Sequence, residues 1–152
     1  MSKDISSALS RVRESARELN QLCDEAAESV RSLEEYLAKE CSVGIEAFVV
    51  VSSDHAEDHA ESMHLCYGRW GGGFRVYLQW MDTRDPFTSS KAWAECRRED
   101  KIATLPLLFD LVESIENEIK SRLDKARAAI SDIKKLTNSA AAPKPGAQNA
   151  KK

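Results

Sequence analysis

The sequence predicts an α+β fold in which a small antiparallel sheet lies between two long helices. Apolar residues recur every three or four positions near both ends of the chain, and they alternate with polar residues in the middle. The 152 residues include 31% charged but only 7% aromatic residues, a composition that favours helical surface over a dense all-β core. This length supports one domain with a modest core.

The first predicted helix carries an unbroken seven-residue repeat of apolar positions. The intervals between these positions alternate between four and three residues, which is the spacing of a coiled-coil seam. The positions are Ile5, Leu9, Val12, Ala16, Leu19, Cys23, Ala26, Val30, Leu33 and Leu37. We therefore expect a long helix that pairs with another helix.

Three segments then change to a period of two, which indicates strands over 44–52, 62–70 and 74–82. The glycines at 71–73 predict a hairpin turn between the last two, since glycine enters positive-φ positions freely. The expected product is a three-stranded antiparallel meander. One face is strongly apolar, and the other carries enough apolar residues that a helix or a partner should cover part of it.

A short helix is expected over 89–103, and a second long helix is expected to open at Pro106. The apolar stripe of the second long helix runs from Leu108 to Leu136. Three strands and a short returning helix would place it antiparallel to the first, as a two-helix coiled-coil arm on a small α+β head. Residues 1–138 then form one domain, and the Ala-, Pro- and Lys-rich residues 139–152 form a disordered tail.

The net charge of −3 conceals two oppositely charged halves. Residues 1–62 hold 6 Lys+Arg and 14 Asp+Glu, whereas residues 63–152 hold 16 and 11. The cations of the second long helix are candidates for contact with nucleic acid: Lys120, Arg122, Lys125, Arg127, Lys134 and Lys135. That end has no aromatic residue for base stacking, so a solvated surface that keeps the protein soluble is the favoured interpretation.

All three histidines lie in one acidic segment, which raises the hypothesis of a metal site. His55 and His59 are four residues apart, the spacing of one helical face, while His64 and Cys66 would share one face of a strand. A solvated acidic connection between two strands explains the same residues without a metal. The sequence implies no cofactor.

Side chains beside the glycine turn are candidate contacts for a partner protein. Trp70, Arg75 and Tyr77 combine large aromatic surface with a cation, the residue types that anchor interfaces. The glycines lack the following helix and Lys-Ser/Thr of a phosphate-binding loop. Packing of these aromatic residues on a helix or on another subunit is the favoured interpretation, and contact with a partner is the alternative.

These observations favour a non-enzymatic interaction protein. No catalytic motif appears in a strand–turn–helix context, and no apolar run approaches the length of a membrane helix. The four cysteines are scattered, and we expect reduced thiols in a cytoplasmic protein. A coiled-coil arm favours a dimer that docks a protein partner, and a small nucleic-acid-associated protein is the alternative. The sequence leaves open the partner and whether the arm pairs within or between chains.

Overall fold

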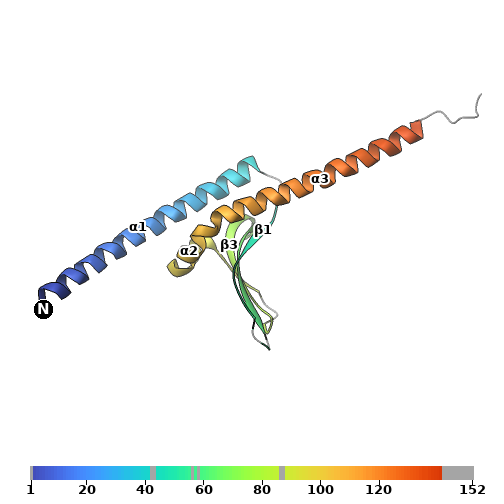
Figure 1. Cartoon of the computed structure of the whole chain (residues 1–152). Coiled ribbons are helices and arrows are strands. Elements are labelled where there is room, and N and C mark those ends of the chain that lie inside the picture. Colours follow the sequence, from blue (N-terminus) through green and yellow to red (C-terminus); the bar gives the residue numbers. More distant parts are fainter. Residues whose placement is uncertain (1, 42–43, 56, 58, 86–87, 142–152) are drawn as a thin grey trace, which may run out of the picture. The chain divides into compact units, whose positions relative to one another are not determined.

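The computed structural model describes residues 2–41, 44–55, 57, 59–85 and 88–141. It confirms an α+β fold with a long helix near each end (Figure 1). The elements in chain order are α1 (Ser2–Glu40), β1 (Ala47–His55), β2 (Ala60–Trp70), β3 (Gly73–Asp82), β4 (Ser89–Ala92), the 3-10 turn η1 (Trp93–Glu95), α2 (Arg98–Thr104), the 3-10 turn η2 (Leu105–Leu107) and α3 (Leu108–Ala141).

The chain divides into two compact units, residues 1–116 and residues 117–152. Helix α3 begins in the first unit and continues into the second. It ends at Ala141, so residues 139–141 of the predicted tail are helical. The rest of that tail lies outside the described residues. The antiparallel coiled-coil arm stays a prediction.

The sheet has four antiparallel strands in the order β1-β2-β3-β4, not the three predicted. The error lies at the start of the segment predicted as one short helix over 89–103. Residues Ser89–Ala92 instead pair with Tyr77–Trp80 of β3, and helix begins only with η1 and α2. The polar residues of this strand have little local preference, so the unpaired edge of β3 decides their conformation.

The register confirms the predicted division of the sheet into two faces. Ala47, Tyr67 and Val76 are cross-strand neighbours on the covered face, and Phe48, Cys66 and Tyr77 are neighbours on the other. The β1–β2 register shifts between Val50 and Ser52, so that Ser52 lies opposite Met63. From this point to the end of β1, the predicted assignment of residues to the two faces does not hold. A bulge of this kind adds one residue to a strand and reverses the facing of those beyond it.

The predicted glycine turn is present between β2 and β3. Gly71 and Gly72 have φ values of 57° and 92°, and they form a two-residue hairpin loop. Positive φ at both central positions is the requirement of a type I′ turn, whose twist matches that of the flanking strands. This turn sets the register in which Arg75 lies opposite Gly68, and Tyr77 opposite Cys66.

The core of the first unit lies where α1 and the start of α3 meet the inner half of the sheet. Helix α1 packs against β3, η1 and α2. Two positions of its apolar repeat, Val30 and Leu37, are buried, and so is Leu111 of α3. The earlier positions of the repeat, from Ile5 to Leu19, are exposed. The predicted seam is therefore divided, with its second half serving as core.

A buried polar contact joins η1 to the end of α2. The indole Nε1 of Trp93 donates a hydrogen bond to Thr104 Oγ1 at 2.9 Å, and both side chains are fully buried. Thr104 Oγ1 in turn donates to the carbonyl oxygen of Asp100 at 2.7 Å. This chain of hydrogen bonds satisfies two groups that would be costly to bury unpaired.

None of the helices described in the structure is long and apolar enough to cross a membrane.

Candidate interaction surfaces

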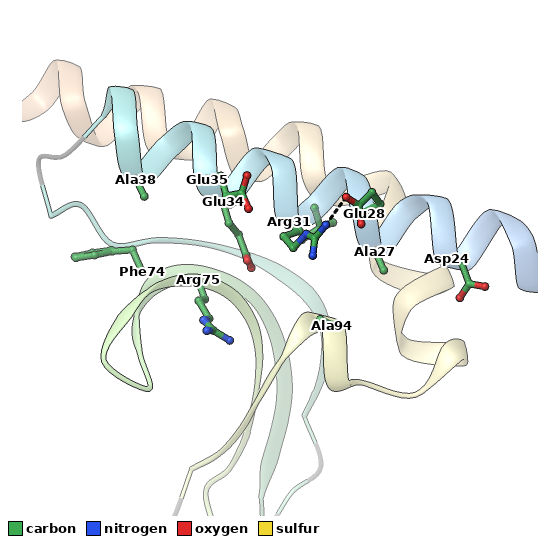
Figure 2. Close-up of a pocket in the computed structure, with 11 residues that line it drawn as sticks. Asp24, Ala27, Glu28, Arg31, Glu34, Glu35, Ala38, Phe74, Arg75 and Ala94 are labelled. Carbon is green, nitrogen blue, oxygen red and sulfur yellow. Dashed lines mark hydrogen bonds and ion pairs between the residues drawn. The ribbon is translucent and has the colours of Figure 1, made fainter.

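A groove of about 560 Å³ runs along the second half of α1, where the helix faces the start of β3 (Figure 2). We call it the α1 groove. Alanines at positions 27, 38 and 94 leave room at its floor, and carboxylates of α1 dominate its charge. Glu28 is paired with Arg31 one turn later, at 2.5 Å. Asp24 and Glu35 add two more carboxylates to its lining.

Glu34 connects α1 to the sheet at this groove. Its Oε1 accepts a hydrogen bond from the backbone N–H of Val76 at 2.9 Å. Strand β4 pairs with β3 only from Tyr77 onward, so Glu34 satisfies an edge N–H that no strand reaches. Burial raises the pKa of the Glu34 carboxyl, while the Val76 hydrogen bond and the nearby Arg75 act in the opposite direction.

The raised pKa of Glu34 predicts that its contribution to stability falls as the pH rises. The folded state holds this proton more tightly than the unfolded state, so folding is favoured below the usual glutamate pKa. The advantage is lost as the pH rises through the folded value. We expect Glu34→Gln, which keeps the acceptor oxygen, to remove this slope and to leave stability at pH 7 unchanged or higher. Urea unfolding between about pH 4 and pH 8 measures it.

Two further variants control this experiment. Glu35→Gln removes one negative charge from an exposed neighbour and should leave the slope in place. Glu34→Ala also removes the acceptor and should cost about 1 kcal/mol or more at every pH, because the Val76 N–H loses its partner. Identical pH profiles for the wild type and Glu34→Gln would contradict the assignment.

A second surface is the face of the sheet opposite the covered one, which we call the open sheet face. It holds a concavity of about 620 Å³. Two of its side chains are conspicuously exposed for apolar residues, Phe48 at 59% and Val50 at 50%. Beside them, burial raises the pKa of the Cys66 thiol to about 11, so this thiol is protonated at neutral pH. A protonated thiol is a poor nucleophile and a poor metal ligand.

The structure brings two of the four predicted metal ligands, His64 and Cys66, to one concavity but does not gather all four. His55 ends β1 and is in contact with Ser53 Oγ at 3.0 Å, so the predicted helical pairing with His59 is wrong. His59 lies 3.7 Å from a carboxylate oxygen of Glu61. His64 packs its ring on Phe48, with centroids 5.3 Å apart. Among the described residues, no three His, Cys, Asp or Glu side chains converge on a point that would hold a metal ion.

The three predicted partner contacts share the open face but separate into different surroundings. Tyr77 is half-buried and lines the concavity. Arg75 is exposed and lines the α1 groove (Figure 2). Trp70 is half-buried and lines neither. The most exposed apolar side chains of this face are Phe48, Val50 and Met81, so its apolar surface lies further from the glycine turn than predicted.

Both long helices also carry exposed apolar stripes. On α1, the N-terminal positions Ile5, Leu9 and Val12 are 63–64% exposed. On the part of α3 in the second unit, exposure increases from 45% at Leu123 to 71% at Leu136. The six cations predicted as a nucleic-acid surface all lie on α3 and are exposed. Solvent-exposed stripes of this regularity are candidates for interaction surfaces.

Sequence reasoning missed Glu34 and the Trp93–Thr104 contact. Glu34 lies four residues after Val30 and three before Leu37, so its position on the buried side of α1 was readable from the repeat. The Trp93–Thr104 contact had no such signal, because a single helix was expected over both η1 and most of α2.

All four cysteines are free thiols. Comparisons with protein-family models, with curated proteins and with solved structures find no match.

Proposed function

We propose that this protein is a non-enzymatic interaction protein that self-associates through the N-terminal half of α1 and docks a protein partner. The observation that supports it is the exposed seam of that half, Ile5, Leu9, Val12, Ala16 and Leu19. A helical segment of this length is marginal in water on its own and gains most of its stability from packing. A second copy supplies that packing.

The residues that flank the seam favour pairing between identical copies. In the heptad frame that places Leu9 at a and Val12 at d, the e and g positions are Ser6, Ala8, Arg13, Ser15, Asn20 and Leu22. Only one of these six is charged, so two copies do not repel each other along the interface. Leu22 widens the apolar stripe and is 52% exposed.

Charged substitutions in the seam test self-association. We expect the full chain to dimerise at micromolar concentrations, and Leu9→Asp/Val12→Asp to weaken the dimer by at least about a hundredfold, because two pairs of carboxylates would be buried at the interface. The measurement is sedimentation equilibrium over a range of concentrations. Circular dichroism of the full-length variant checks that its fold is intact.

The control introduces the same charges on the outer face of α1. Ser7→Asp/Ser10→Asp adds two carboxylates at exposed positions outside the seam and should leave the dimer unchanged. A wild-type chain that stays monomeric to about 100 μM, or a dimer that the two double variants weaken equally, would refute this part of the proposal.

The open sheet face supports the partner-docking part of the proposal. Phe48 and Val50 present apolar surface that a soluble monomer seldom leaves uncovered, and Tyr77 offers a half-buried ring with a polar end. Phe48 and Val50 lie on β1 and Tyr77 lies on β3, and both strands are hydrogen-bonded to β2 between them, so these side chains are rigidly placed. We place the protein contact here rather than at Trp70.

A further inference from the structure

The second unit carries an apolar seam that differs from that of α1 in the charges beside it. Helix α3 is continuous through this unit, so the heptad frame can be assigned by position. Leu123 and Ile130 occupy a positions, and Ala126 and Ile133 occupy d positions. We call these four residues the α3 seam, and each is exposed.

Every charged residue that flanks the α3 seam is a cation. The charged e and g positions are Lys120, Arg122, Arg127 and Lys134. The two carboxylates of the same stretch lie away from the seam, Asp124 at b and Asp132 at c. Asp132 is within 3.9 Å of Lys135, at the outer f position. The charge is therefore sorted by position on the helix.

Cationic flanks oppose pairing of the α3 seam with a second copy of itself. A parallel pair would place Arg122 at g opposite Arg127 at e of the other helix, and an antiparallel pair would oppose e with e and g with g. Each arrangement brings like charges together, which destabilises a coiled coil. The exposed seam of α1 offers no carboxylate at its e and g positions, so it does not complement these charges either.

We propose that the α3 seam binds an amphipathic helix of another protein, one with apolar a and d positions and carboxylates at e and g. Such a helix covers both features of this surface, since its apolar side chains bury the seam and its carboxylates pair with the flanking cations. Nucleic acid would neutralise the cations but leave the seam exposed to water. A membrane-surface helix needs a wider apolar face with aromatic residues, and residues 117–141 contain none.

The α3 seam consists of other residues than the exposed apolar positions of α1, so its test does not depend on self-association. The probe is a fluorescein-labelled peptide of three heptads with Ile at a, Leu at d and Glu at e and g, titrated with the full chain. The matched peptide carries Lys at e and g. Fluorescence anisotropy should show at least about tenfold tighter binding of the Glu peptide. The Leu9→Asp/Val12→Asp chain should give the same preference.

Two double variants with equal change of net charge identify the flanks as the cause. Arg127→Glu/Lys134→Glu should remove the preference for the Glu peptide or reverse it toward the Lys peptide. Lys125→Glu/Lys135→Glu makes the same charge change at the c and f positions and should keep most of the preference. Ile130→Asp should abolish binding of both peptides, since it buries a carboxylate in the seam.

Three results would overturn the proposal. The first is equal binding of the Glu and Lys peptides, and the second is an equal loss in both double variants, which would indicate unspecific attraction. The third combines three observations. The Glu peptide does not bind, random-sequence duplex DNA or phosphatidylserine vesicles do bind, and Ile130→Asp leaves that second binding intact. DNA binding of this kind would assign the cations to nucleic acid instead.

Discussion

Replacing Trp93 with alanine is expected to lower the free energy of unfolding by about 3–5 kcal/mol. The Trp93 side chain is fully buried, and it lies beneath the ammonium group of Lys101, which is 5.6 Å from the ring. Its removal would leave a large cavity at the point where the sheet, α1 and α2 meet. Urea denaturation followed by circular dichroism measures the loss.

The polar part of the Trp93 contribution can be separated from its volume. Thr104→Val removes the acceptor of the indole N–H and should cost about 1–3 kcal/mol, because a buried donor is left unpaired. Thr104→Ser keeps the hydroxyl and should cost less. In a Trp93→Phe background, which lacks the N–H, Thr104→Val should cost clearly less than in the wild type. Equal costs in both backgrounds would refute the hydrogen bond.

Leu111→Ala is expected to destabilise the first unit by about 2–5 kcal/mol. Leu111 is fully buried, and it lies three residues before Ser114, whose Oγ donates to the carbonyl oxygen of Phe48 at 3.3 Å. These residues attach the first turns of α3 to β1 of the sheet. The variant should lower the melting temperature of the first unit, measured by calorimetry on the full chain.

Phe109→Ala is the matched control for Leu111→Ala. Phe109 lies on the same turn of α3, but 71% of its surface is exposed. Its loss should change the stability by no more than about 0.5 kcal/mol, although phenylalanine is the larger side chain. Equal destabilisation by the two variants would mean that the start of α3 does not pack as described.

Much of the fold was readable from the sequence because the periodicity of apolar residues follows helix and strand geometry directly. The repeat from Ile5 to Leu37 predicted α1, and the alternation over 62–82 predicted two strands with the correct faces. The prediction failed at Ser89–Ala92, where the strand forms because β3 has an edge to pair with. Such pairing is a property of residues far apart in the sequence, so local patterns do not report it.

The candidate surfaces were readable to a smaller extent. The cations of α3 and the apolar residues of β1 could be counted, but which of them remain exposed depends on what packs against them. Tyr77 and Trp70 were given equal weight as contacts, and the structure shows that the most exposed apolar side chains of that face are Phe48, Val50 and Met81. Burial is set by tertiary contacts, which a single sequence does not display.

By itself, the sequence determined the α+β class, the two long helices, the glycine turn and the sorting of charge along α3. Each of these depends on local geometry or on the order of residues alone. Only the tertiary structure decided that the repeat of α1 is half core and half exposed seam, and that Glu34 closes the open edge of β3. A seven-residue repeat has the same spacing whether it faces a sheet or a partner helix, so only packing distinguishes the two.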